Sequence, residues 1–320
     1  MRHLTSCIIL ALAALLPTAC YHDQHDLPPA EDPEQPAGYL TPLLEWEEQA
    51  DTLKTPDHVM VTVAGINGTG PSEDFDSPQS AAEWLQQLPA GDYDLLVTAD
   101  MDASHGYVLT SVSRSATRAG EQKDNTLPDM RVSLIDPASS PSQAWFGVTH
   151  ATVKADEITI AEVPLQRLLS EISVIVSNVP TGAAISASVE RVAHDVLLTH
   201  RDGQGRYGVA DREDYMTVSL GALAADPADA ATLRHDDHTL MPTAGGQPRC
   251  YLTLSVTTPE GTRLTYLADA PRMECGKTYV VELDYTKLRP YMLLEAFTIN
   301  DWTEGWTISG EIINPDRGIF

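Results

Sequence analysis

Short runs rich in β-branched residues recur along the chain and are separated by Gly, Pro, Asp and Asn. Residues 58–64 read HVMVTVA and stop at Gly65, and residues 93–99 read YDLLVTA after the turn at 89–92. Similar runs occupy 130–135, 151–163, 168–177, 183–192, 215–220, 251–257, 262–267, 278–285 and 291–299. Short strands at spacings of about 8–12 residues are typical of antiparallel sandwiches. The sequence therefore predicts an all-β fold.

Helical signals are few. Residues 80–88 (SAAEWLQQL) have Ser80 as a candidate N-cap and Glu83 three residues later, the capping-box spacing. Residues 226–233 predict a short turn of helix. Neither segment alternates with strands in a βαβ pattern, so a parallel sheet is not expected. Residues 67–78, 113–128 and 222–248 are predicted to be long loops.

The N-terminus has the parts of a secretory leader. Arg2 supplies the positive charge, and the apolar run 7–16 is too short to span a bilayer. The ending Leu-Pro-Thr-Ala-Cys resembles the lipobox of bacterial lipoproteins, although Pro17 stands where Leu is usual. The resemblance implies that Cys20 is acylated, for example with palmitate, and begins the mature chain. The alternative is an ordinary signal peptide with Cys20 a spare thiol.

The residues after Cys20 are acidic and rich in proline, and no Lys or Arg occurs between Arg2 and Lys54. Proline favours extended backbone and like charges repel, so a stretched tether is predicted. The whole chain has 46 acidic and 20 basic residues, a net charge of -26. This balance argues against nucleic acid as a partner and against docking on an anionic membrane through a basic face.

With 320 residues, the chain is long enough for two domains after a leader, and a boundary is expected near Pro164. The predicted organisation is a leader over 1–19, a tether over 20–38, and two β-sandwiches over 39–164 and 165–320.

No catalytic pattern is present. The sequence has no Gly-x-Ser-x-Gly elbow, no His-Glu-x-x-His helix and no phosphate-binding glycine loop. Cys250 and Cys275 lack the spacing of a zinc ribbon; they could form a disulfide in an oxidising compartment or remain two buried free thiols. An enzyme is not expected, and no cofactor is implied.

Three weaker clusters contain metal-ligand residue types. Residues 234–238 (RHDDH) could form a metal site or a solvated loop, and the loop is favoured. Residues 100–104 open like a calcium loop, but the sixth position is His105 rather than Gly and the twelfth is Ser111 rather than Glu. Residues 21–26 are better explained as spacer. No metal site is predicted.

Trp302 and Trp306 are four residues apart and would share one face of a strand. Stacked on a sheet, they could form a platform that binds sugar. Covering one end of a core is the more common role of such a pair.

Several segments together resemble the fimbrillin-like lipoproteins of Bacteroidales, the group that includes fimbrial anchor subunits. They are 16–20 with the acidic stretch behind it, 43–46 (LLEW), 88–95 (LPAGDYDL), 164–174 (PLQRLLSEISV) and 299–312. The resemblance implies two tandem antiparallel, transthyretin-like β-sandwiches behind a lipid anchor in the outer membrane. It also implies partners that are fimbrial subunits, joined by donation of a strand.

The resulting hypothesis is a surface-exposed outer-membrane lipoprotein that binds fimbrial subunits through edge strands in fimbria assembly or cell adhesion. Residues 291–299 and 307–313 are the candidate augmenting segments. The alternative hypothesis is a surface lipoprotein that binds glycan through Trp302 and Trp306.

Overall fold

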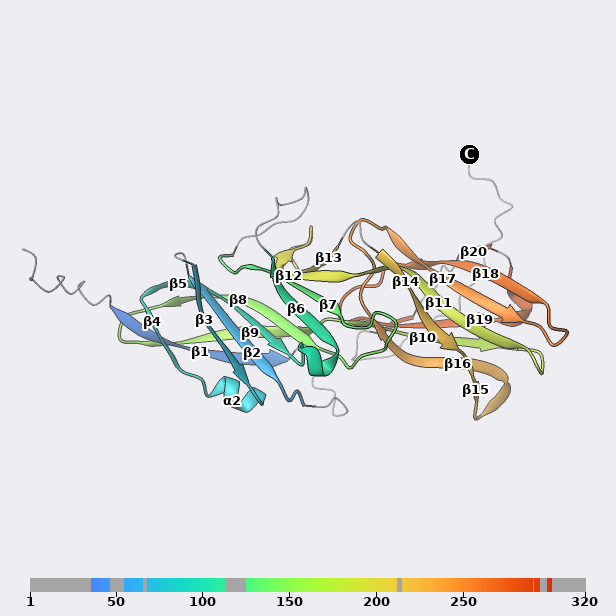
Figure 1. Cartoon of the computed structure of the whole chain (residues 1–320), viewed down its shortest axis with the longest axis horizontal. Helices are drawn as coiled ribbons and strands as arrows, with labels where there is room; N and C mark the ends of the chain where they lie inside the picture. Colours follow the sequence, from blue (N-terminus) through green and yellow to red (C-terminus); the bar gives the residue numbers. More distant parts are fainter. Residues whose placement is uncertain are drawn as a thin grey trace, which may run out of the picture.

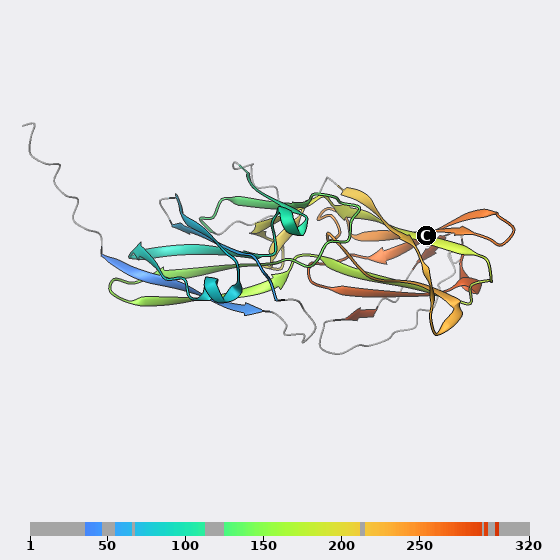
Figure 2. The same ribbon diagram turned by 60° about the horizontal axis from the view of Figure 1, so that its bottom comes forward.

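A computed structural model describes residues 36–46, 55–65, 68–112, 125–211, 215–289, 291–293 and 298–300. This part of the chain contains strands β1 to β21, one short α-helix and two single-turn 3-10 helices. Figures 1 and 2 show an elongated molecule in which the strands form two successive groups. The all-β prediction is confirmed. No helix in the described residues is long and apolar enough to cross a membrane.

A seven-stranded sheet with the order β3-β2-β5-β8-β9-β1-β4 forms most of the first group. Its strands are β1 (Ala37–Trp46), β2 (Val59–Gly65), β3 (Gly68–Phe75), β4 (Gln86–Pro89), β5 (Gly91–Ala99), β8 (Trp145–Val153) and β9 (Ile158–Arg167). One buried cluster contains Leu40 of β1, Val61 of β2 and Val163 of β9. The β9-β1-β4 part of the sheet therefore packs face to face against the β3-β2-β5-β8 part.

A four-stranded sheet, β13-β12-β7-β6, covers the opposite face of β5 and β8. Its strands are β6 (Tyr107–Val112), β7 (Asp129–Leu134), β12 (Asp195–Arg201) and β13 (Tyr207–Ala210). Leu95 and Leu96 are neighbours on β5, yet both are fully buried, in different clusters. Successive side chains of a strand point to opposite faces, so β5 is the middle of three layers.

The second group is a sandwich of two five-stranded sheets. One has the order β15-β16-β10-β19-β21 and consists of β15 (Ala224–Asp226), β16 (Asp229–Leu240), β10 (Ser170–Ser177), β19 (Thr278–Asp284) and β21 (Thr298–Asn300). The other has the order β14-β11-β17-β18-β20 and consists of β14 (Tyr215–Ala222), β11 (Ala184–Ala193), β17 (Arg249–Thr257), β18 (Arg263–Pro271) and β20 (Tyr291–Leu293). Alternate residues such as Leu252, Leu254 and Val256 point into the core. Most pairs are antiparallel; β1–β9, β10–β19 and β18–β20 are parallel.

The hairpin of β12 and β13 connects the two groups. The hairpin follows the predicted domain boundary at 164/165 in the sequence. However, β12 pairs with β7, which precedes that boundary. Figure 1 places β12 and β13 at the junction of the two groups. One buried hydrophobic cluster also runs from Ala64 in the first group to Leu288 in the second. The division of the chain into domains at 164/165 stays a prediction.

The helix predicted at 80–88 is wrong in position and length. The α-helix, α2, spans Pro78–Ala82, and its N-cap is Ser77, whose side-chain oxygen accepts from the Ser80 N–H. Proline at the first helical position favours this start. Residues 86–89 instead form β4, because Leu88 is buried against the core and pairs with Gly38 of β1.

The turn of helix predicted at 226–233 is also wrong. Asp226 and Asp229 are paired at the tight connection between β15 and β16. Most of the loop predicted at 222–248 is therefore strand. The small and polar residues of this segment obscured the pairing of β16 with β10, which buries Leu240.

Candidate interaction surfaces

Eight strands lie at the ends of the sheets in the described residues: β3, β4, β6, β13, β14, β15, β20 and β21. Five of them, β4, β13, β15, β20 and β21, have four residues or fewer. The edge strand β3 contains Pro71, Glu73 and Asp74, and β14 has two register shifts against β11. Shortness, proline, charge and bulges are the usual protections of an edge against pairing with another chain.

The edge strand β6 has none of these protections. Its sequence, YVLTSV, contains no charge and no proline, and it pairs with β7 without a shift from Tyr107–Leu134 to Val112–Asp129. Just before it, the Gly106 carbonyl oxygen accepts from the Ile135 N–H at 2.9 Å. Hydrogen-bonded and non-hydrogen-bonded pairs alternate in an antiparallel ladder. The backbone groups of residues 109 and 111 therefore point away from β7.

Local contacts hold β6 firmly in place. The η1 turn (Ala103–His105) precedes it, and Gly106 ends that turn at φ 91°. Tyr107 is buried, and its N–H donates to the Asp102 carbonyl oxygen at 2.9 Å. Val108 is 41% exposed on the outer face. No described strand pairs with the outer edge of β6, so β6 has an available edge in this part of the structure.

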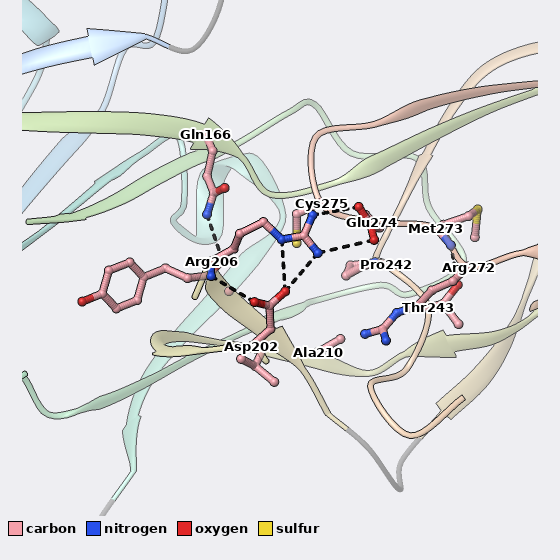
Figure 3. Close-up of a pocket in the computed structure, with 13 residues that line it drawn as sticks. Gln166, Asp202, Arg206, Ala210, Pro242, Thr243, Arg272, Met273, Glu274 and Cys275 are labelled. Carbon is pink, nitrogen blue, oxygen red and sulfur yellow. Dashed lines mark hydrogen bonds and ion pairs between the residues drawn. The ribbon is translucent and has the colours of Figure 1, made fainter. Parts of the chain in front are cut away.

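A small pocket lies where the β12–β13 hairpin meets the loop after β18 (Figure 3). Its volume is about 60 Å³, room for a few water molecules. The Arg206 guanidinium donates to Glu274 at 2.8 Å and to Asp202 at 2.9 Å. These contacts raise the pKa of Arg206, and the hydrogen bonds from Arg206 lower the pKa of Glu274. Arg206 is therefore paired with both carboxylates of the pocket, Asp202 and Glu274, and these contacts act as a clamp on the hairpin.

The two candidate disulfide cysteines are free thiols. Cys250 lies in β17 and is buried, and its thiol lies 3.0 Å from the Pro271 carbonyl oxygen. Cys275 is half-buried beside the clamp. Burial raises the pKa of each thiol to about 12, so both stay protonated at neutral pH.

Three predicted site residues, Cys20, Trp302 and Trp306, lie outside the described residues, as does the segment 307–313. The anchor and the aromatic platform stay predictions. Part of the segment 291–299 is described: β20 runs parallel to β18, and β21 runs antiparallel to β19. Each of these three-residue strands ends a sheet of the second group.

The cluster at 234–238 lies in β16, not in the solvated loop that the sequence favoured. A register shift accompanies Asp237, which has φ 53°, and it brings two imidazoles together: His235 Nε2 lies 3.2 Å from His238 Nδ1. His238 is 7% exposed. Burial, with a smaller effect of His235, lowers the pKa of His238 to about 4.

The buried His238 should make the protein less stable in acid. Its pKa is about 4 when folded and about 6.5 when unfolded. Between these values the unfolded state binds a proton that the folded state does not, so the free energy of unfolding should fall by about 3 kcal/mol as the pH drops through this window. Urea unfolding at pH 7.0 and 4.5 should show a smaller drop for His238→Gln than for wild type. Equal drops would contradict the assignment.

A family model for fimbrillin-A associated anchor proteins Mfa1 and Mfa2 matches residues 59–306. The chain belongs to this family. The match covers most of both strand groups, including β6 and the β12–β13 hairpin. The family is one of fimbrial anchor proteins, which agrees with the resemblance found in the sequence.

Two solved structures from Bacteroides thetaiotaomicron VPI-5482 have a similar fold. A candidate adhesin from Bacteroides thetaiotaomicron VPI-5482 is 12% identical, with a TM-score of 0.50 and coverage of 87% of this chain and 98% of the other. A candidate polysaccharide-binding protein from the same organism is 13% identical, with a TM-score of 0.51 and coverage of 88% and 100%. The fimbrial anchor protein Mfa2 from Porphyromonas gingivalis is 14% identical, with a TM-score of 0.47 and coverage of 82% and 98%. No curated protein matches the chain.

Proposed function

We propose that this chain is a lipid-anchored accessory subunit of the outer membrane that binds fimbrial subunits. The observation that carries the proposal is the family match over residues 59–306. The acylated Cys20 and the acidic tether over 20–38 hold the folded part at the cell surface. The role needs no catalysis and no cofactor.

The contact with a fimbrial subunit is proposed to be strand addition at the outer edge of β6. A partner strand would bond to the outward-pointing N–H and C=O groups of Leu109 and Ser111, while side-chain contacts such as those with Val108 would contribute specificity. Strand addition is favoured at an uncharged, proline-free edge with a regular register, and these properties are combined in β6 among the edge strands of the described residues.

The substitution Ser111→Pro tests this contact. Proline removes the N–H that points away from β7, so it should leave the β6–β7 ladder intact and block an added strand. We expect the wild-type protein, captured from its own envelope, to retain fimbrial subunits identified by mass spectrometry. Ser111→Pro should retain about tenfold less, a loss of about 1.4 kcal/mol in binding.

The matched control is Ser111→Ala, which keeps the backbone N–H at the same position and should capture subunits as the wild type does. Thermal melting of both variants checks that the fold is intact. Equal capture by Ser111→Pro would place the contact elsewhere. Capture of polysaccharide without a fimbrial subunit by the wild type would support the glycan-binding alternative instead.

A further inference from the structure

A cluster of carboxylates and imidazoles lies at the corner where β2 begins and β5 ends. Asp100 follows β5 in a left-handed conformation, φ 50°, and its side chain is 4% exposed. Its carboxylate oxygen Oδ1 accepts the backbone N–H groups of Asp57 at 2.9 Å and His58 at 3.2 Å. These bonds fix the chain before β2 against the chain after β5, so Asp57 and Asp100 are held side by side.

The His105 ring stands between three carboxylates. Its Nε2 atom lies 2.9 Å from Asp57 Oδ1 and 3.7 Å from Asp100 Oδ1, and its Nδ1 atom lies 3.1 Å from Asp102 Oδ2. The ring is 12% exposed. Asp102 is itself fixed, because it caps η1 by accepting the N–H groups of Ser104 and His105.

The Nε2 atom of His105 faces a position that suits a cation. A neutral imidazole has one N–H, and when Nδ1 donates it to Asp102 the lone pair of Nε2 faces two carboxylates. A proton on Nε2 would satisfy Asp57 but would leave Asp100 too distant at 3.7 Å for a hydrogen bond. A metal ion can contact all three groups at once, since one ligand atom from each of Asp57, Asp100 and His105 lies within 4.8 Å of the others.

The surroundings match those of protein metal sites in two further ways. A histidine that binds a metal commonly donates its other N–H to a carboxylate, which fixes the tautomer, and Asp102 is in this position. Asp57 is 57% exposed, so an ion can enter from solvent and keep a water ligand. One imidazole with two carboxylates suits Zn²⁺ or Mn²⁺, whereas Ca²⁺ prefers six to eight oxygens.

We propose that Asp57, Asp100 and His105 bind one divalent transition-metal ion, Zn²⁺ or Mn²⁺, and that Asp102 positions His105 for it. The ion would join the start of β2 to the end of β5 and to η1. Sequence pattern alone does not reveal this site, because Asp57 is 43 residues from Asp100 and residues 100–104 resemble only the opening of a calcium loop.

Isothermal titration of the EDTA-treated, dialysed protein with ZnCl₂, and separately with MnCl₂, tests the proposal. We expect saturable binding of one ion, with the melting temperature raised in parallel. Asp57→Asn and His105→Gln should each lower the affinity about tenfold or more. Asp57 is exposed, so Asp57→Asn should fold normally even if His105→Gln does not. Asp102→Asn should weaken binding, and Asp102→Glu should restore most of it.

The control is Asp74→Asn, which removes an exposed carboxylate from the same corner. Asp74 contacts His58 at 3.5 Å but not His105 in the described contacts, so its loss should leave the affinity unchanged. Absence of binding of both ions at millimolar concentration would overturn the proposal. Unchanged affinity in Asp57→Asn would do the same.

Discussion

Replacing Phe146 by alanine should lower the free energy of unfolding by about 3–5 kcal/mol. Phe146 lies on β8 and is fully buried in the cluster that runs through both strand groups. Its ring lies against Gly208 of β13, where an added Cβ atom would come within 2.5 Å of Phe146 Cζ. Removing the ring would leave a cavity between the middle layer and the β12–β13 hairpin. Urea unfolding followed by circular dichroism measures the loss.

Two further variants serve as controls for this loss of stability. Phe146→Leu keeps most of the apolar volume and should cost less than Phe146→Ala. Tyr215→Ala removes an aromatic ring that is 48% exposed on β14, and should change stability by about 0.5 kcal/mol or less. A loss below about 1 kcal/mol for Phe146→Ala would mean that the hairpin does not pack on β8.

Replacing Cys20 by alanine should move the protein almost completely from the membrane fraction to the soluble fraction. Each buried methylene of an acyl chain contributes about 0.8 kcal/mol to membrane binding, and the variant has no thiol to acylate. A net charge of -26 offers no attraction to anionic lipid, and the described residues include no membrane-spanning helix. Cell fractionation with an antibody against the folded part measures the distribution.

Cys275→Ser is the matched control, because it removes a half-buried free thiol from the folded part and should leave the protein in the membrane pellet. If Cys20→Ala still pellets with membranes, the anchor is not the Cys20 thiol. This outcome would leave the strand-addition proposal standing, since the Ser111→Pro comparison does not depend on the anchor.

Local sequence predicted the strands well where they are regular. The runs at 58–64, 93–99 and 130–135 became β2, β5 and β7. The failures have local causes. The capping-box spacing at Ser80 was outweighed by Ser77-Pro78 and by the pairing of residues 86–89 with β1. In β16, polar residues such as His235 and Asp236 hid a strand that is stabilised by pairing with β10.

The candidate sites were harder to predict than the strands. The unprotected edge of β6 depends on which strand lies beside it, and the sequence of β6 alone is that of any half-buried strand. The corner of Asp57, Asp100 and His105 depends on the antiparallel pairing of β2 with β5, which places Val59 opposite Ala99. A search for ligands at short spacing could not find it.

The sequence by itself determined the fold class, the family resemblance and the expectation of an anchored, acidic, non-catalytic protein. These follow from composition and local pattern, because alternation of apolar residues and turn chemistry act over a few residues. Only the tertiary structure decided that β12 pairs with β7, that β6 has an available edge and that His105 faces three carboxylates. These features depend on contacts between residues far apart in the chain, which local propensity does not specify.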